Sequence, residues 1–425
     1  MESRELLDRL ADGEFDTRIA EIYAVGEGAN ARARLTDLAA RFAEIFPGLP
    51  AALFTAAGRT EMGGNHTDHQ HGQVLAGSVS LDMIACAGPN GTDTIRVRSE
   101  GYPEVVVDLA DLEPNEAEYG SSAALVRGVA RGLRDHGYKL GGVSLCIESN
   151  VLGGSGLSSS AAYEILIGVV LNHFFCDGDV SAVELAQIGQ YAENVFFGKP
   201  CGLMDQLACA VGGVVHIDFA DPASPEIRKV DVDLAAAGHV LCIIDSGADH
   251  ADLTDEYADI IGEMGAVAAC FGEEHLSRVD PAAFWSRLGE VRAQAGDRAV
   301  LRAIHFFEDN ARVPEQAAAL AEGRFDDFLG LVAASGVSSA TNLQNLFATS
   351  QPTQQAVGVT IAVAQHLLGG KGAVRVHGGG FAGTVQAYVP TEMAATFKAG
   401  IEAVLGEGMC HTLSIRPVGG GVIAS

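Results

Sequence analysis

The sequence predicts an α+β fold, in which strands and helices come in clusters. Short apolar runs bounded by glycine predict strands, and other stretches place apolar residues at helical spacing. The two kinds of segment do not alternate strictly, as a doubly wound parallel sheet requires. The length of 425 residues, with 48% apolar and 19% charged residues, exceeds one ordinary hydrophobic core. It therefore predicts a globular chain of two or three domains.

The chain before residue 220 contains predicted helices and predicted strands. The sequence begins with apolar residues at helical spacing. A serine-rich turn precedes one later helix, and a capping box formed by Ser181 and Glu184 begins another. A Gly-Gly pair ends the apolar segment 204–211. The predicted helices are 5–25, 36–46, 161–171 and the one that Ser181 opens. The predicted strands are 51–57, which ends at Gly58, then 73–88 as one or two strands, 143–147 and 214–219.

The second half of the chain is mainly helical. Two prolines interrupt the chain near 220–235, and we place a domain boundary there, which gives domains 1–225 and 226–425. A strand over 240–245 comes first, and helices follow to about Leu368. The last predicted elements are strand 373–376, a glycine turn, strand 384–389, helix 391–405 and a strand near Leu413.

The charge of the chain excludes several classes of protein. Asp and Glu number 55 against 27 Lys and Arg, which gives a net charge of −28. This argues against a nucleic-acid partner, which needs a basic surface, and against a polybasic membrane-surface protein. No apolar run approaches the roughly 20 residues that span a bilayer. The eight cysteines form no CxxC pair, which is typical of reduced thiols in a cytoplasmic protein.

The first motif with chemical potential is the turn LGGSGLSSSAA at residues 152–162, which follows a strand and enters a helix. Glycines allow the backbone to approach a ligand, and the start of a helix favours an anion. The serines add hydroxyl donors, one of which can bind a metal. The turn lacks the lysine of a P-loop. It therefore predicts either a phosphate-binding loop of another type or an ordinary serine-capped helix.

The second motif is GRTEMGGNHTDHQH at residues 58–71, a polar stretch after an apolar strand. Amides, imidazoles and carboxylates hydrogen-bond to sugar hydroxyls, so one interpretation is a sugar site. A second is a metal site, because four side chains are possible ligands. They are His66, Asp68, His69 and His71. A third is a solvated loop, and local spacing leaves all three open.

The third motif is ENVFFGKPCGLMDQ at residues 193–206. Glu193 ends a helix, and Asp205 begins the next apolar segment. An aspartate at this place is commonly only a helix cap. If a phosphate and a metal lie nearby, Glu193 becomes a magnesium ligand and Asp205 a general base.

The fourth motif is the glycine run at residues 378–383, which fits the pattern GxGxxG. A dinucleotide-binding loop needs a helix after these glycines. The segment that follows, TVQAYV, predicts a strand instead, so the dinucleotide interpretation is excluded. A tight hairpin remains, or a glycine loop that packs beside another loop or a phosphate.

Together and in this order, the four motifs resemble those of the galactokinase family in the GHMP superfamily of small-molecule kinases. The matching strings are GRTEMGGNHTDH, GGSGLSSSAA, CGLMDQ and VHGGGFAG. The resemblance covers the chain from about residue 36 to the end and leaves the first 30 or so residues without a functional interpretation. It implies a two-domain fold that holds ATP and a sugar between the domains. It also implies transfer of the γ-phosphate of ATP to the anomeric hydroxyl of galactose.

The resemblance also implies roles for single residues. Asp205 matches the catalytic aspartate, which accepts or orients the hydroxyl proton, and Arg59 matches the arginine that stabilises charge beside it. Ser160 and Glu193 match the ligands of Mg²⁺. The expected contacts of the sugar are Asn65, His66, Asp68, Gly202 and Tyr257. The expected contacts of ATP are Gly154, Ser155, Gly156, Leu157, Ser158, Ser159 and Ser160.

The chain departs from the family pattern at several positions. Asn65 stands where the signature has a glutamate that contacts a sugar hydroxyl, and Glu61 stands where it has an asparagine. Leu152 replaces a common proline, and Ala382 replaces a glycine. Residues 121–128 lack the aromatic side chains that often reach the adenine pocket.

Three functions follow from these observations. The first is a Mg-ATP-dependent kinase for galactose, with a galactose derivative, arabinose or a uronic acid as the alternative substrate. The second is a sugar-sensing regulator that has lost catalysis. The third is a metal hydrolase that uses the histidine cluster of residues 66–71.

Overall fold

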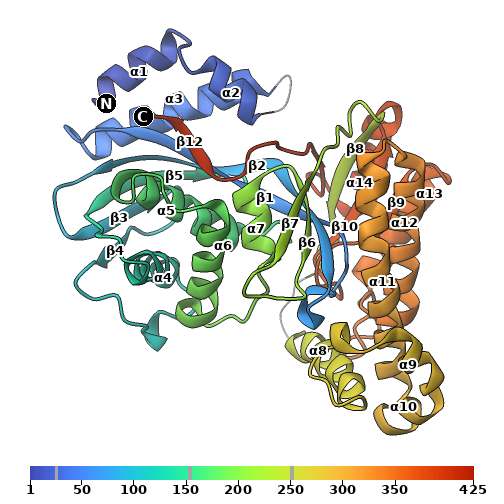
Figure 1. The fold of residues 1–425 in the computed structure, drawn as a ribbon. Helices are drawn as coiled ribbons and strands as arrows, with labels where there is room; N and C mark the ends of the chain where they lie inside the picture. Colours follow the sequence, from blue (N-terminus) through green and yellow to red (C-terminus); the bar gives the residue numbers. More distant parts are fainter. Residues whose placement is uncertain (24–26, 152–155, 249–252) are drawn as a thin grey trace.

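The structure is a computed structural model, and it describes residues 1–23, 27–151, 156–248 and 253–425. Its strands form two sheets with helices packed against both (Figure 1), which confirms the α+β class. Within these ranges, no helix is long and apolar enough to cross a membrane. All eight cysteines are free thiols.

The first sheet contains eight strands in the described part of the chain. They are β1 (Ala52–Gly63), β2 (Gln73–Pro89), β3 (Thr94–Ser99), β4 (Val105–Asp108), β5 (Val143–Ser149), β6 (Val214–Asp218), β7 (Glu226–Val230) and β12 (Gly421–Ala424). The order is β12-β1-β2-β5-β3-β4, and the other end of β2 pairs with β6, which pairs with β7. Among the strands described, β3 and β5 alone run parallel. The predicted region 73–88 is thus one long strand, which pairs with β1, β5 and β6.

The predicted end of a strand at Gly58 is wrong, because β1 continues to Gly63. The register between β1 and β2 shifts between Ala57 and Arg59, which marks a bulge. A Cβ atom at Gly58 would lie 3.2 Å from the carbonyl oxygen of Leu157. The glycine therefore allows a close backbone approach rather than ending the strand. The Arg59 N–H donates to that same carbonyl at 3.1 Å, which ties β1 to the serine-rich turn.

Helices cover both faces of the first sheet (Figure 1). On one face lie α1 (Ser3–Ala11), α2 (Asp16–Ile22) and α3 (Gly28–Ile45). The predicted helix over 5–25 is thus two helices. On the other face lie α4 (Ser122–Asp135), α5 (Ser159–Phe175), α6 (Ala182–Tyr191) and α7 (Met204–Val211). The predicted capping box of Ser181 and Glu184 begins α6.

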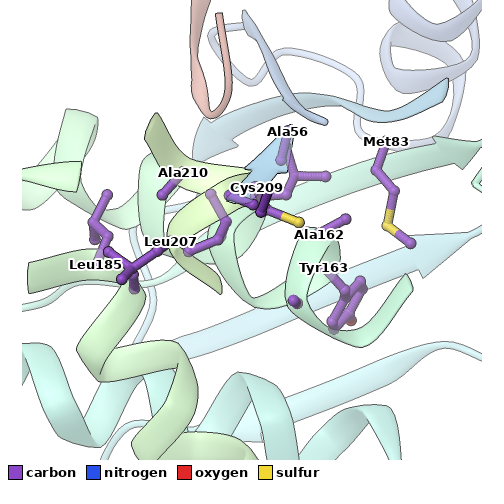
Figure 2. Close-up of a cluster of buried hydrophobic side chains, with 14 of the residues drawn as sticks. Ala56, Met83, Ala162, Tyr163, Leu185, Leu207, Cys209 and Ala210 are labelled. Carbon is purple, nitrogen blue, oxygen red and sulfur yellow. The ribbon is translucent and has the colours of Figure 1, made fainter. Parts of the chain in front are cut away.

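Apolar packing holds α5 and α7 against β1. Figure 2 shows Ala162 of α5 close to Cys209 of α7, with Ala56 of β1 beside them. Burial of one large side chain such as Leu207 contributes about 1.5–3 kcal/mol. Because the serine-rich turn begins α5 and Asp205 lies in α7, this core fixes both motifs relative to β1.

The second sheet has the order β11-β8-β10-β9, and its strands are all antiparallel. They are β8 (His239–Asp245), β9 (Ala373–Val376), β10 (Thr384–Pro390) and β11 (Cys410–Leu413). Three helices pack against it: α12 (Phe325–Ser338), α13 (Ala356–Leu368) and α14 (Ala394–Leu405). Further helices form another cluster, namely α8 (Thr254–Ala269), α9 (Pro281–Ser286), α10 (Leu288–Ala295) and the first half of α11 (Asp297–Ala321), whose second half packs on α12 and β2.

Short helical turns connect these elements. They are η1 (Asp68–Gln70), η2 (Glu116–Glu118), the π-helix η3 (Ala192–Phe197), η4 (Leu276–Arg278), the π-helix η5 (Ser339–Leu343) and η6 (Thr391–Met393). The division into domains 1–225 and 226–425 stays a prediction. Two strands from beyond residue 225, β7 and β12, pair in the first sheet.

Candidate active site

An ion pair between Arg59 and Asp205 lies at the centre of the site. Arg59 Nε donates to Asp205 Oδ1 at 2.7 Å, and Nη2 donates to Oδ2 at 2.7 Å. The Asp205 side chain is 27% exposed, whereas Arg59 is buried. Arg59 comes directly after the bulge of β1, and Asp205 lies in the first turn of α7. Asp205 is not the helix cap, because the N-cap residue is Leu203.

Asp205 is ionised at neutral pH. Burial alone would raise the pKa of this carboxyl, but the charge and hydrogen bonds of Arg59 and the Ser158 hydroxyl outweigh it, so the pKa lies below its usual value. A carboxylate has about four acceptor positions. Contacts from the described residues occupy one on Oδ1 and two on Oδ2. One position on Oδ1 is therefore left unfilled by the residues that the structure describes.

The serine-rich turn contacts this pair directly. The Ser158 hydroxyl donates to Asp205, and Arg59 also donates to the Gly156 carbonyl. Ser158 precedes α5 with a positive φ of 56° and makes no side-chain cap hydrogen bond, so it is not an ordinary serine cap. Strained backbone of this kind clusters at functional sites. The neighbouring Leu157 is buried, and Ser159 is the first residue of α5. Gly154 and Ser155 lie outside the described residues.

Ser160 and Glu193 meet next to the ion pair. The Ser160 hydroxyl donates to Glu193 Oε1 at 2.9 Å, and Lys199 Nζ lies 3.3 Å from the same oxygen. Gln206 Nε2 donates to Glu193 Oε2 at 2.8 Å and to Glu164 Oε2 at 3.0 Å. Glu193 is in the π-helix η3, an element often found at functional sites. A hydroxyl and a carboxylate are hard oxygen ligands of the type that Mg²⁺ prefers.

The second motif brings polar side chains to the glycine run. His66 Nε2 contacts the Gly379 carbonyl at 2.9 Å, and the Tyr257 hydroxyl donates to the Gly380 carbonyl at 2.8 Å. Burial lowers the pKa of His66 to about 4, with His69 adding to the effect, so the ring is neutral. Its Nε2–H must then donate, and Nδ1 is an acceptor. Nδ1 is buried and has no partner among the described residues.

Asp68 and Gly202 lie against each other. A Cβ atom at Gly202 would lie 2.5 Å from Asp68 Oδ2, so a larger residue there would displace the Asp68 carboxylate. Of the predicted sugar contacts, His66 and Tyr257 thus meet at the glycine loop, and Asp68 and Gly202 pack against each other.

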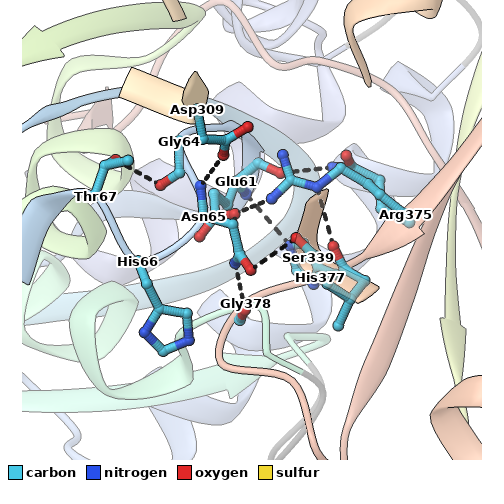
Figure 3. Close-up of polar contacts among 12 residues, drawn as sticks. Glu61, Gly64, Asn65, His66, Thr67, Asp309, Ser339, Arg375, His377 and Gly378 are labelled. Atoms are coloured by element: carbon cyan, nitrogen blue, oxygen red, sulfur yellow. Dashed lines mark hydrogen bonds and ion pairs between the residues drawn. The ribbon is translucent and has the colours of Figure 1, made fainter. Parts of the chain in front are cut away.

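Asn65 lies deeper than the other predicted sugar contacts. Figure 3 shows its amide between Glu61, Ser339 and Gly378. Glu61 contacts Arg375. Burial raises the pKa of Glu61 to about 7, although the Arg375 guanidinium opposes the shift.

The residues described contain no group of three or more His, Cys, Asp or Glu side chains arranged to hold a metal. In the stretch from His66 to His71, Asp68 Oδ1 lies 3.9 Å from His69 Nε2, and His71 instead stacks on His275 with 3.7 Å between ring centroids. The geometry therefore does not favour the hydrolase interpretation.

The sequence interpretation missed several residues of the site. Gln206 and His377 lie inside the matched strings, so their position was a usable signal. His377 is buried, with Nδ1 2.8 Å from Thr384 Oγ1 and Nε2 3.1 Å from Thr60 Oγ1. Lys199 also lies within the third motif.

An ionised aspartate paired with an arginine, a serine-rich helix start and a Ser-Glu oxygen pair lie where the first sheet meets the glycine loop of the second. This fold and site define a small-molecule kinase of the GHMP type. Two family models match the chain. They are the "GHMP kinases N terminal domain" over residues 124–213 and the "Galactokinase galactose-binding signature" over residues 40–89.

Similarity to known proteins identifies the family within this class of kinases. A galactokinase of Streptomyces coelicolor is 31% identical over 368 residues, which are 86% of this chain and 89% of the relative. The chain therefore belongs to the galactokinase family. The structure of Lactococcus lactis galactokinase complexed with galactose matches with a TM-score of 0.76 at 24% identity, over 92% of this chain and 99% of that one. A mevalonate kinase of Methanococcus jannaschii matches with a TM-score of 0.61 at 12% identity, over 87% and 99%. Both structures share the fold.

Proposed function

We propose that this protein transfers the γ-phosphoryl group of ATP to the anomeric hydroxyl of galactose and so forms galactose 1-phosphate. Family membership and the galactose-binding signature support this reaction. The observation that carries it is the Arg59–Asp205 pair, which offers an ionised carboxylate with one acceptor position that no described residue fills. We also propose that the protein acts in the cytoplasm, which its eight free cysteines support.

In the proposed reaction, Asp205 accepts the proton of the anomeric hydroxyl. The hydroxyl oxygen bonds to the γ-phosphorus as the bond from that phosphorus to the bridging oxygen breaks, and ADP leaves with the electron pair. Arg59 keeps Asp205 ionised until the proton arrives and balances negative charge beside the phosphoryl group. General-base assistance of this kind typically contributes 10²–10⁴-fold.

The start of α5 would bind the phosphates of ATP through backbone N–H groups and the serines 158–160. Ser160 and Glu193 would hold Mg²⁺, since their oxygens lie 2.9 Å apart. The ion, when bound, neutralises charge on the phosphate oxygens. Lys199 lies 3.3 Å from Glu193 and adds positive charge to this side of the site.

The sugar would contact the groups that line the glycine loop. His66 Nδ1, a buried acceptor without a partner among the described residues, is suited to a sugar hydroxyl. Asp68 adds a carboxylate beside Gly202. Tyr257, which donates to the Gly380 carbonyl, would lie on the opposite side of the sugar site.

ADP release with Mg-ATP across a panel of sugars tests this proposal. The panel contains galactose, N-acetylgalactosamine, arabinose and galacturonic acid. We expect galactose to be preferred and Asp205→Asn to lower kcat by roughly 10²–10⁴-fold. Asp326→Asn makes the same substitution on an exposed residue outside the site and should leave kcat unchanged.

Three results would change the proposal. Substantial turnover by Asp205→Asn would contradict the role of that aspartate. Preference for another sugar would retain the kinase and replace galactose as its substrate. Tight sugar binding without turnover of any sugar would favour the regulator.

A further inference from the structure

The side chain of Asn65 has no polar group left for a ligand. It is fully buried. The amide nitrogen donates to Glu61 Oε1 at 3.1 Å and to the Gly378 carbonyl at 2.7 Å. The amide oxygen accepts from Asn345 Nδ2 at 2.8 Å and from Ser339 Oγ at 3.3 Å. An asparagine side chain has two donors and two acceptor positions, so these contacts use all four.

The backbone of Asn65 is held as firmly. Its N–H donates to Asp309 Oδ2 at 2.8 Å, and its carbonyl accepts from His305 Nε2 at 3.0 Å. Both partners come from α11 and are buried. Asn65 therefore joins the end of β1 to α11, to the η5 region and to the loop between β9 and β10.

The same loop carries the candidate sugar contacts. His66, the next residue, contacts the Gly379 carbonyl, and Asn345 Nδ2 also donates to that carbonyl at 3.1 Å. Tyr257 donates to Gly380. A shift of the Asn65 amide would thus move His66 and the glycine loop together, whichever sugar hydroxyl each side chain contacts.

We infer that Asn65 is a positioning residue, which fixes His66 and the glycine loop for sugar binding and does not itself contact the sugar. This inference rests on the proposed function. Relative to the family signature, the carboxylate and the amide have exchanged positions 61 and 65. The structure places these two side chains in contact, and the carboxylate at position 61 pairs with Arg375.

Dissociation constants for galactose and its 2-, 3-, 4- and 6-deoxy analogues distinguish positioning from contact. We expect Asn65→Ala to weaken the binding of all five sugars by a common factor of about 10 or more, because a misplaced loop affects every contact with the sugar. For each deoxy analogue, the ratio of its dissociation constant to that of galactose should stay within twofold of the wild-type ratio. His66→Ala is the matched control. If His66 contacts one hydroxyl directly, its loss should abolish the penalty for removing that particular hydroxyl.

Loss of the penalty for a single deoxy sugar in Asn65→Ala would overturn the inference, and so would unchanged binding of all five. Ser339→Ala, which removes one donor to the same amide oxygen, tests it if Asn65→Ala does not fold. We expect a smaller but equally uniform weakening, and a hydroxyl-specific effect would again overturn the inference. Failure of the wild type to bind any of the five sugars would instead overturn the proposed function, and the inference with it.

Discussion

Arg59 contacts both carboxylate oxygens of Asp205, and this ion pair sets the protonation state of the proposed base. Burial raises the pKa of the carboxyl, and the guanidinium lowers it by more. A carboxyl whose pKa is depressed in the folded state contributes stability above its unfolded pKa, which is lost as the pH falls through the folded value. The pair therefore links catalysis and stability at a single residue.

Arg59→Met should leave burial as the main influence on Asp205, so the pKa of the carboxyl should rise. We expect kcat/KM to fall by roughly 10²–10³-fold and the acidic limb of the pH profile to move to higher pH. The measurement is kcat/KM against pH for both proteins, with Arg59→Lys as the variant that keeps the charge. An acidic limb at the wild-type position in Arg59→Met would contradict this account.

At the scale of elements, the loop between β9 and β10 shows why its glycines are needed. Gly378 and Gly380 both have a positive φ, of 67° and 83°. A Cβ atom at Gly378 would meet nothing within 4 Å, whereas one at Gly380 would clash with the backbone carbonyl of Asn345. The first position therefore requires glycine only for its conformation, and the second requires it also for space.

Substitution of each glycine by alanine separates these two effects. We expect Gly378→Ala to cost about 1–2 kcal/mol in the free energy of unfolding, from the left-handed conformation alone. Gly380→Ala should cost clearly more, because the Asn345 carbonyl must also move. Urea unfolding of both variants measures the difference, and equal destabilisation would show that the close contact has no energetic weight.

The sequence predicted elements where the signal is local. The capping box of α6 and the strands β9 and β10 are examples, and so are the four motifs. It did not predict α4 or the short strands β3 and β4. The four residues of β12 lie in a glycine-rich tail and pair with β1, far away in the chain. Such pairing is decided by the tertiary fold and leaves no periodic pattern.

The site was predictable to the same extent. Arg59 and Asp205 meet as the family resemblance implied. The partners of Asn65 on α11 and η5 could not be predicted, because they come from segments more than 200 residues away. In the sequence, His305 and Asp309 are an ordinary polar pair on a helix, and only the fold shows that they hydrogen-bond to the Asn65 backbone.

At the scale of the whole molecule, buried Asp82 of β2 joins both ends of the chain. Arg34 of α3 and Arg416, which precedes β12, contact its oxygens at 2.8 and 2.9 Å. The Tyr23 hydroxyl donates to it at 2.6 Å. Burial raises the pKa of Asp82, but the two arginines lower it by more, so the pKa lies below its usual value. The N-terminal helices, which lacked a functional interpretation, therefore belong to the structural core.

Arg416→Met should leave Asp82 without one of its two cations. We expect a loss of about 3–5 kcal/mol in the free energy of unfolding at pH 7, as for other broken buried pairs. Because the folded pKa of Asp82 rises, unfolding on acidification should begin at higher pH. Arg228→Met removes an arginine from an exposed pair with Glu226 and should change stability little. Urea unfolding at several pH values checks both, and equal effects of the two variants would contradict the role of Asp82.

The central claim is that Asp205 directs the γ-phosphoryl group to the anomeric oxygen of galactose. NMR of the product formed from Mg-ATP and galactose labelled with ¹³C at C1 tests it most directly. We predict that phosphorus couples to the labelled carbon, as galactose 1-phosphate requires, and that Asp205→Asn gives no such signal in the same time. Phosphate on another carbon, or release of inorganic phosphate with no sugar phosphate, would contradict the account.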